Sequence, residues 1–150
     1  MPISPSKSKV CFFFQDVRVS LDNRTGLKSF IQSFFGKRGK KLDFVNFIFC
    51  TDKALLEINR QYLKHDFYTD IITFDLSETD SIQAEVYISI DRVRENARQL
   101  EVSFKSELHR VIFHGLLHLC GYKDKSPRER GEIRKKEDFL LTQYFKYRST

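Results

Sequence analysis

Cysteine is scarce in this chain and long apolar runs are missing, and each absence excludes a class of protein. The three cysteines, Cys11, Cys50 and Cys120, are odd in number and far apart among 150 residues. This spacing argues against a secreted disulfide framework, and the lack of any Cys-x-x-Cys pair excludes a cysteine-rich zinc knot. No run approaches the length of a membrane span, and the first residues show no apolar signal core. We therefore expect a cytoplasmic protein with no membrane association.

Phenylalanine and basic residues are abundant instead. There are fifteen phenylalanines but no tryptophan, and a hydrophobic fraction of 41% with 31% charged residues is ordinary for a globular protein. A chain of this length suits one domain with a sizeable core. The net charge of +6 is compatible with a polyanionic partner, although many basic proteins of this size bind no nucleic acid.

The apolar pattern predicts alternating strands and helices in the first half of the chain and helices alone in the second. The predicted elements, in order, are a strand at 10–14, a helix around 27–35, a strand at 44–50, a helix capped by Thr51 or Asp52 and reaching about residue 63, strands at 69–74 and 84–90, and three helices after residue 91. The last of these helices starts at a capping box, Ser126-Pro127-Arg128-Glu129.

These elements predict an α+β fold with a mixed sheet of about four strands covered by helices. The short loop between the strands at 69–74 and 84–90 makes them antiparallel neighbours, and the histidine-bearing helix is expected to run through the core. No repeat or linker divides the sequence, so residues 1–150 form a single domain. Residues 1–8 are expected to be loosely attached, because they contain Pro2, Pro5 and several serines.

Two histidines stand four residues apart in the most apolar stretch of the sequence. On a helix, His114 and His118 lie one turn apart on the same face, from which two imidazoles can reach one divalent metal. Gly121 ends this helix, and Asp124 follows ten residues after the first histidine. A carboxylate there can turn back as the third ligand and leave a position for water. The layout is that of a catalytic metal site and not of a closed structural one.

The alternative to a metal site is a structural role, because a single histidine on an apolar face is usually a core residue. Two imidazoles among leucines cost free energy unless both find partners, and one metal supplies a partner for both. Two histidines and a carboxylate suit zinc, and also iron or nickel. Such an ion lowers the pKa of bound water to about 7, which provides a nucleophile for a phosphoryl or carbonyl centre.

Other residues in or near this pattern carry weaker signals. Among the other carboxylates, Asp16, Asp75 and Glu137 have no helical pairing with the histidines, but Glu137 lies on the inward stripe of the last helix. We expect it to be a buried partner for an arginine or for a ligand histidine.

Gly115 stands where helix-borne zinc proteases carry their glutamate base, which disfavours peptide hydrolysis and favours close helix packing. Cys120 is expected to be a small core residue, and the lack of a Cys-x-x-Cys pair counts against a zinc deaminase.

Several short motifs follow one another over roughly residues 45 to 145: Asn59-x-x-Tyr62, His65-Asp66, Thr69-Asp70-Ile71-Ile72-Thr73-Phe74, Ala84-Glu85-Val86-Tyr87-Ile88-Ser89 and His114-Gly115-x-Leu117-His118-Leu119-x-Gly121-Tyr122. In their order and spacing, these motifs together resemble the YbeY family of ribosomal RNA maturation endoribonucleases. The resemblance implies a zinc-binding endoribonuclease directed at single strands. It also implies action in 3′-end maturation of the small-subunit rRNA and in ribosome quality control, with the small subunit or its proteins as partners.

The chain departs from this family at two positions that bear on the site. The family usually has a third histidine where this sequence has Asp124, which keeps the ligand spacing but makes the site more anionic. It often has an arginine where this sequence has Leu63, so Lys64 or Arg60 is a candidate phosphate contact. Lys123, beside the metal motif, is a third candidate for binding RNA.

The candidate metal ligands and the family resemblance are compatible with two functions. The first is a metal-dependent endoribonuclease in which one Zn²⁺, held by His114, His118 and Asp124 as metal ligands and catalytic residues, activates water toward a backbone phosphate. The alternative is a ribosome-assembly or RNA-binding factor with a structural metal and little intrinsic catalysis. Exposed aromatic side chains could stack on unpaired bases, with three tyrosines as candidates: Tyr62, Tyr68 and Tyr87.

Overall fold

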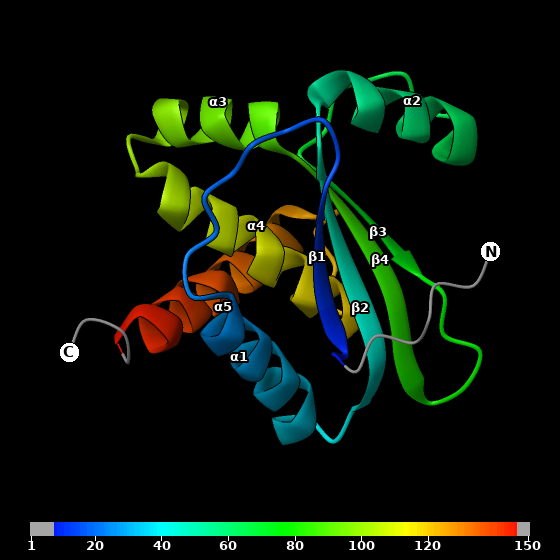
Figure 1. Cartoon of the computed structure of the whole chain (residues 1–150), viewed down its shortest axis with the longest axis vertical. Helices are drawn as coiled ribbons and strands as arrows, with labels where there is room; N and C mark the ends of the chain where they lie inside the picture. The colour runs from blue at the N-terminus through cyan, green and yellow to red at the C-terminus, as the bar shows by residue number, and fades with distance from the viewer. Residues whose placement is uncertain (1–7, 147–150) are drawn as a thin grey trace.

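The structure, a computed structural model, describes residues 8–146, and its elements follow the predicted order (Figure 1). They are β1 Val10–Phe14, α1 Arg24–Lys37, β2 Lys41–Cys50, α2 Asp52–Leu63, β3 Ile71–Asp75, β4 Ser81–Ser89, α3 Ile90–Leu100, α4 Phe104–Leu119 and α5 Pro127–Lys146. The loosely attached start expected at residues 1–8 lies, apart from Ser8, outside the described residues. None of the described helices combines the length and the apolar character needed to cross a bilayer.

The four strands form one mixed sheet in the order β1-β2-β4-β3. β1 pairs with β2 in parallel, and β2 pairs with β4 in parallel. Parallel neighbours need a crossover connection, which α1 provides between β1 and β2. β3 pairs with β4 in the antiparallel sense, with Ile72 opposite Tyr87, so the predicted antiparallel pairing is confirmed. This leaves β3 at one edge of the sheet.

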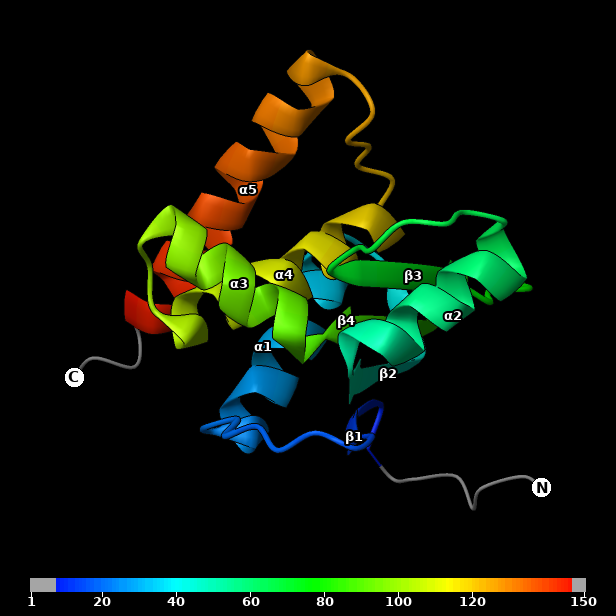
Figure 2. The same ribbon diagram turned by 90° about the horizontal axis from the view of Figure 1, so that it is seen from above.

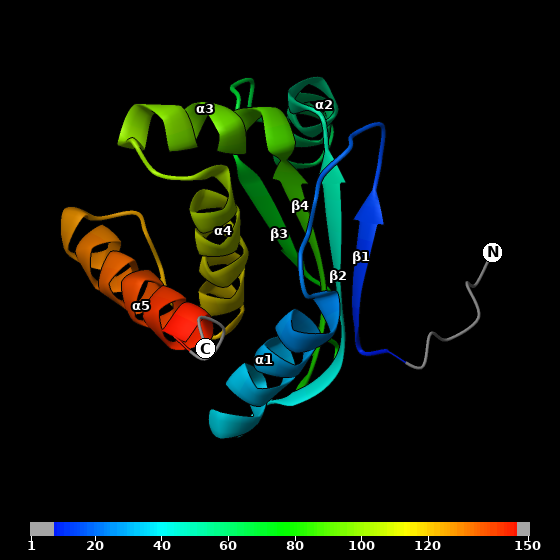
Figure 3. The ribbon, with the colours of Figure 1, turned by 60° about the vertical axis from the view of Figure 1, so that its left-hand side comes forward.

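Helices cover the two faces of the sheet unequally. On one face, α1, α4 and α5 share an aromatic core. The centroid of the Phe30 ring lies 5.2 Å from that of Phe113 and 5.1 Å from that of Tyr144. On the opposite face, α2 packs through Leu55 against Ile72 of β3. Figures 2 and 3 show α4 between the sheet and α5, with α3 crossing one end of the layers.

Helix α4 is the central helix of the fold, as predicted. Ten of its sixteen residues are buried. Ser103 caps its start by accepting a hydrogen bond from the Ser106 N–H, as the sequence predicts. Its end is also where the sequence predicts it, because the chain turns at Gly121, whose φ of 95° favours glycine. The capping box of α5 is formed as well, since Ser126 and Glu129 each accept a hydrogen bond from the other's backbone N–H.

The boundaries of three strands differ from the prediction. β2 begins at Lys41 and β3 begins only at Ile71. Ile90, predicted as the last residue of its strand, is instead the first residue of α3, because Ser89 caps that helix by accepting from the Arg92 N–H. The alternating apolar pattern of β4 continues to Ile90 because this side chain is buried at the start of α3, as it would be in a strand.

Gly115 allows α4 to approach the sheet closely, as the sequence predicts. A Cβ atom at this position would lie 3.1 Å from Ile71 Cδ1 and 3.3 Å from Val86 Cγ1. These two atoms belong to β3 and β4, so the missing side chain sets the spacing between α4 and the edge of the sheet. Gly131 of α5 contrasts with it, because a Cβ atom there would meet nothing within 4 Å.

A pair of glycine substitutions should therefore have opposite effects on stability. We expect Gly115→Val to lower the free energy of unfolding by about 1–3 kcal/mol through overpacking against β3 and β4. Gly131→Ala should raise it by about 0.5–1 kcal/mol, because alanine costs less backbone entropy in a helix and here meets no neighbour. Urea denaturation followed by circular dichroism measures both. Equal stability of the two variants would contradict the close packing at Gly115.

Candidate metal centre

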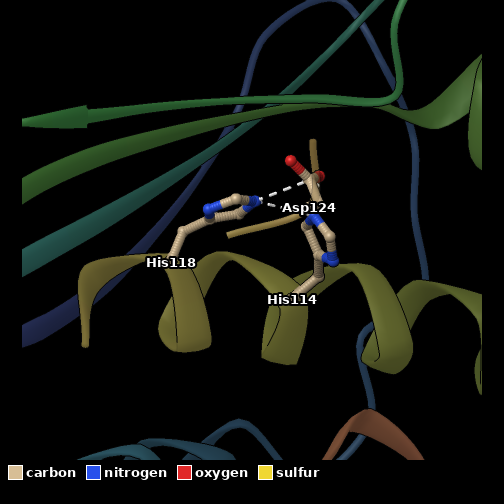
Figure 4. Close-up of side chains that lie close together, drawn as sticks. All are labelled: His114, His118 and Asp124. Atoms are coloured by element: carbon tan, nitrogen blue, oxygen red, sulfur yellow. Dashed lines mark hydrogen bonds and ion pairs between the residues drawn. The ribbon is translucent and has the colours of Figure 1, made fainter. Parts of the chain in front are cut away.

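The sequence-predicted ligands His114, His118 and Asp124 come together in the structure. The two rings rise from one face of α4, and Asp124 approaches them from the loop that follows the helix (Figure 4). The Nε2 atoms of the two histidines lie 3.0 Å apart. Asp124 Oδ2 lies 3.2 Å from His114 Nε2 and 3.3 Å from His118 Nε2. One donor atom of each residue therefore faces a common point.

The loop between α4 and α5 holds Asp124 in this place. Gly121 turns the chain back after α4, and the capping box at Ser126 starts the next helix a few residues later. Between them, the Arg130 guanidinium donates hydrogen bonds to the backbone carbonyls of Asp124, at 3.4 Å, and of Lys125, at 3.0 Å. The two helix ends thus leave a short segment whose course brings the carboxylate over the histidines.

The triangle of donor atoms fits a divalent metal. Ligand bonds of about 2.0–2.1 Å in a tetrahedral zinc site place neighbouring donors about 3.3–3.4 Å apart. The three observed separations, 3.0, 3.2 and 3.3 Å, are close to one face of such a tetrahedron. The two imidazoles and the carboxylate are also ligand types that zinc accepts. These three residues can hold a metal ion with little rearrangement.

A buried ionic network behind His114 orients its ring. The Nδ1–H of His114 donates to Glu137 Oε2, which leaves Nε2 to face Asp124 and His118. Arg110 donates to the other oxygen of Glu137 at 2.9 Å, and its guanidinium also makes two hydrogen bonds to Glu107. Both glutamates are only 1% exposed. The predicted role of Glu137, a buried partner for an arginine or a ligand histidine, is confirmed for both partners.

This network shifts the pKa values of both groups that share the hydrogen bond. Burial opposes ionisation of Glu137, but the hydrogen bond from His114 and the charge of Arg110 outweigh it and lower the pKa of that carboxyl. Burial also opposes protonation of His114, yet the hydrogen bond and charge of Glu137, with the charges of Asp70 and Asp124, raise its pKa above the ordinary value. The site therefore favours a positive charge at His114, which a proton or a metal ion can supply.

An open cavity of about 460 Å³ lies in front of the three ligands. The other residues that line it belong to the end of α2, the loop that follows, β3 and α4: Asn59, Leu63, His65, Phe67, Thr69, Asp70, Ile71, Ile72, Thr73, Asp75 and Leu119. The three candidate ligands thus stand on the wall of an open cavity, an arrangement compatible with a catalytic site.

Asp70 is a cavity residue that sequence reasoning missed. It immediately precedes β3, and its Oδ2 accepts a hydrogen bond from Asn96 Nδ2 at 3.2 Å. Burial raises the pKa of its carboxyl, against the opposing charges of Arg110 and His114. Arg110 was missed as a specific residue too, although its position four residues before His114 on the same helix face was a signal.

The three predicted RNA contacts lie outside this cavity. Arg60 is exposed and forms an ion pair with Asp66. Lys64 ends α2 in the left-handed conformation, with a φ of 57°. Lys123 lies on the wall of a separate cavity of about 270 Å³ around the loop between α4 and α5. None of the three is among the described residues that line the cavity in front of His114, His118 and Asp124, and their role in binding RNA stays a prediction.

Comparison with known proteins places these features in a family. Residues 15–145 match the family model described as "Endoribonuclease YbeY". A Cytophaga hutchinsonii protein of that name is 45% identical over 138 residues, which cover 91% of this chain and 96% of the relative. A Parabacteroides distasonis protein of the same name is 41% identical over 132 residues, covering 88% and 93%. A solution structure of a Thermotoga maritima protein superimposes with a TM-score of 0.59 and 25% identity, over 93% of this chain and 92% of that one.

Removing the charge of Glu137 should change how metal binding depends on pH. Because the pKa of His114 is raised, the metal-free protein keeps a proton on this ring to a higher pH than an ordinary histidine does; metal binding must release that proton, so affinity should rise with pH. In Glu137→Gln the pKa of His114 falls, so affinity should level off at a lower pH. At high pH, where the affinity no longer changes, the variant should bind zinc about 10- to 100-fold more weakly than the wild type, because its His114 ring is less well oriented.

Calorimetric zinc titrations in two buffers of different ionisation enthalpy measure both the affinity and the protons released. Glu132→Gln is the matched control, because Glu132 is an exposed α5 residue paired with Arg128. It should behave as the wild type does. The same pH profile for Glu137→Gln and the wild type would show that the carboxylate does not control His114.

Proposed function

The chain belongs to the endoribonuclease YbeY family, and from this membership we propose that it is a metal-dependent enzyme that cleaves single-stranded regions of ribosomal RNA. As a family member it is an RNA-cleaving hydrolase of rRNA processing. The steps we assign to it are 3′-end maturation of the small-subunit rRNA and ribosome quality control. The observation that carries the proposal is the triangle of His114, His118 and Asp124 on the wall of an open cavity.

We assign one Zn²⁺ per chain to His114, His118 and Asp124 as ligands and catalytic residues. When bound, such an ion lowers the pKa of water so that it can attack a backbone phosphate. The separations of the donor atoms and the two imidazole ligands support this metal. Asp124 replaces a neutral imidazole by a carboxylate, and the added negative charge makes the site more tolerant of a harder ion.

The residues around these ligands have separate tasks. Glu137 keeps the Nδ1 proton on His114, so that Nε2 presents its lone pair to the other two ligands. We assign Asp70 as the acceptor of the proton that the attacking water loses. Its carboxylate lines the same cavity, and burial raises its pKa toward the range in which a base works at neutral pH. Arg60, Lys64 and Lys123 are proposed to contact phosphates on either side of the cleaved position.

The cellular setting follows from this activity. We propose that residues 1–150 form one catalytic domain that meets its rRNA substrate in the cytoplasm, on the small ribosomal subunit or with its proteins. The net charge of +6 supports contact with a polyanion.

Loss of one ligand should remove metal and cleavage together. We expect His118→Ala and Asp124→Ala to lose nearly all bound zinc and all cleavage of a labelled single-stranded RNA, while circular dichroism shows a folded protein. Asp124→His is the matched variant, because it restores a donor at this position, and it should keep zinc and activity. Metal content is measured by mass spectrometry on the same preparations.

Full cleavage by either alanine variant would overturn the proposed site. A zinc-loaded wild type that binds RNA but cleaves none would instead favour the alternative of an assembly factor with a structural metal.

Replacement of the proposed proton acceptor should separate catalysis from metal binding. Asp70→Asn keeps an acceptor for Asn96 but cannot take up a proton, so we expect kcat to fall by about 10²- to 10⁴-fold with unchanged zinc content. Asp75→Asn is the control, because Asp75 lines the same cavity and no large role is assigned to it. In the wild type and in Asp75→Asn, kcat should fall at low pH, and this fall should be absent only in Asp70→Asn. Equal losses in both variants would argue for a general effect of cavity charge.

A further inference from the structure

Two aromatic side chains on the cavity wall take no part in the proposed metal site. His65 and Phe67 belong to the loop between α2 and β3, and both line the cavity that contains the three ligands. Their rings stack with centroids 5.0 Å apart and planes inclined by 21°. Phe67 is nevertheless 55% exposed. We call this pair, His65 and Phe67, the aromatic shelf.

The backbone around the shelf is held by a buried amide. Asn59, near the end of α2, is 1% exposed, and its Nδ2 donates a hydrogen bond to the carbonyl of Phe67 at 2.9 Å. The carbonyl of Asn59 accepts from the N–H of His65 at 3.1 Å. A buried amide costs free energy unless it is hydrogen-bonded, so these bonds tie the loop to the helix. An exposed phenylalanine on a loop fixed in this way is preorganised for a ligand.

Other exposed aromatic side chains among the described residues are placed differently. Tyr68 lies beneath the guanidinium of Arg92, which is 5.3 Å from its ring centroid. Tyr62 lies edge-on to Phe74 in a separate groove that Tyr87 also lines. These are the three tyrosines that the sequence offered for base stacking, and none of them lines the cavity of the metal ligands.

The charge of the cavity wall indicates which part of a nucleotide the shelf can take. No lysine or arginine is among the described residues that line this cavity. Three aspartates, Asp70, Asp75 and Asp124, line it instead, and the Arg60 charge nearby is paired with Asp66. This wall disfavours a phosphate away from the ligands, whereas a neutral planar group can lie against the rings.

We propose that the aromatic shelf binds an unpaired nucleobase of the RNA strand, next to the phosphate that is cleaved. Base stacking on aromatic rings is the general means by which proteins hold single strands. A base inside a duplex has both faces covered by its neighbours, so the shelf also selects unpaired RNA. This inference rests on the proposed function, and it adds the residues that recognise the substrate.

Because the chain contains no tryptophan, Phe67→Trp creates a unique fluorescent reporter on the shelf. Phe139→Trp is the matched control, since Phe139 is 54% exposed on α5 and does not line the cavity. The probe is a fluorescein-labelled, 2′-O-methyl oligouridylate of about ten nucleotides, added to the zinc-loaded full chain. Fluorescence anisotropy reports binding of the strand independently of the tryptophan.

We expect the single strand to quench Trp emission in Phe67→Trp over the same concentrations at which anisotropy rises. A duplex of the same length should not quench it, and emission in Phe139→Trp should not change. Phe67→Ala should bind the single strand roughly 5- to 100-fold more weakly and raise KM, with unchanged zinc content, while Phe67→Tyr should bind as the wild type does.

If the strand binds without quenching Phe67→Trp, and Phe67→Ala binds it with wild-type affinity, the proposed binding of a base by the aromatic shelf is wrong and the proposed function is unaffected. A zinc-loaded wild type that neither binds nor cleaves the RNA would overturn the proposed function and the shelf with it. If Phe67→Ala fails to fold, the quenching in Phe67→Trp decides alone.

Discussion

The hydrogen bond from His114 to Glu137 is the interaction on which the site depends. It crosses from α4 to α5, over 23 residues of sequence, and both groups are largely withdrawn from water. Two glutamates and one arginine share this buried region, so one negative charge stays uncompensated unless His114 carries a proton or binds a cation. The packing of α5 on α4 therefore orients the His114 ring and creates an excess negative charge that a proton or a bound cation can neutralise.

A second constraint is the short distance between α4 and the sheet. Gly115 lets the helix lie against Ile71 and Val86, one residue after His114. The same helix thus presents its ligands beside the edge strand β3, where Asp70 and the α2–β3 loop complete the cavity. A histidine pair that served only as core filler would need no such opening beside it. The close packing of α4 on the edge of the sheet thus depends on this glycine.

The two parts of the cavity divide the chemistry between them. The two histidines and the aspartates attract a cation, and in the proposed function that cation would hold the reacting phosphate. The loop held by Asn59 adds an apolar, aromatic surface at the same wall. A single RNA strand combines a phosphate with an exposed base, so it can satisfy both surfaces at once, whereas a duplex cannot.

The sequence by itself determined the element order, the capped starts of α4 and α5, and the grouping of His114, His118 and Asp124 as candidate ligands. Each of these depends on local spacing or local hydrogen bonds, which neighbouring residues decide. Glu137 could be placed on an inward face, but not on a particular partner. Only the tertiary structure paired it with Arg110 and His114, brought Asp70 into the cavity and set Phe67 on its wall. Those positions depend on contacts between segments distant in sequence, and the spacing of residues along one segment does not specify such contacts.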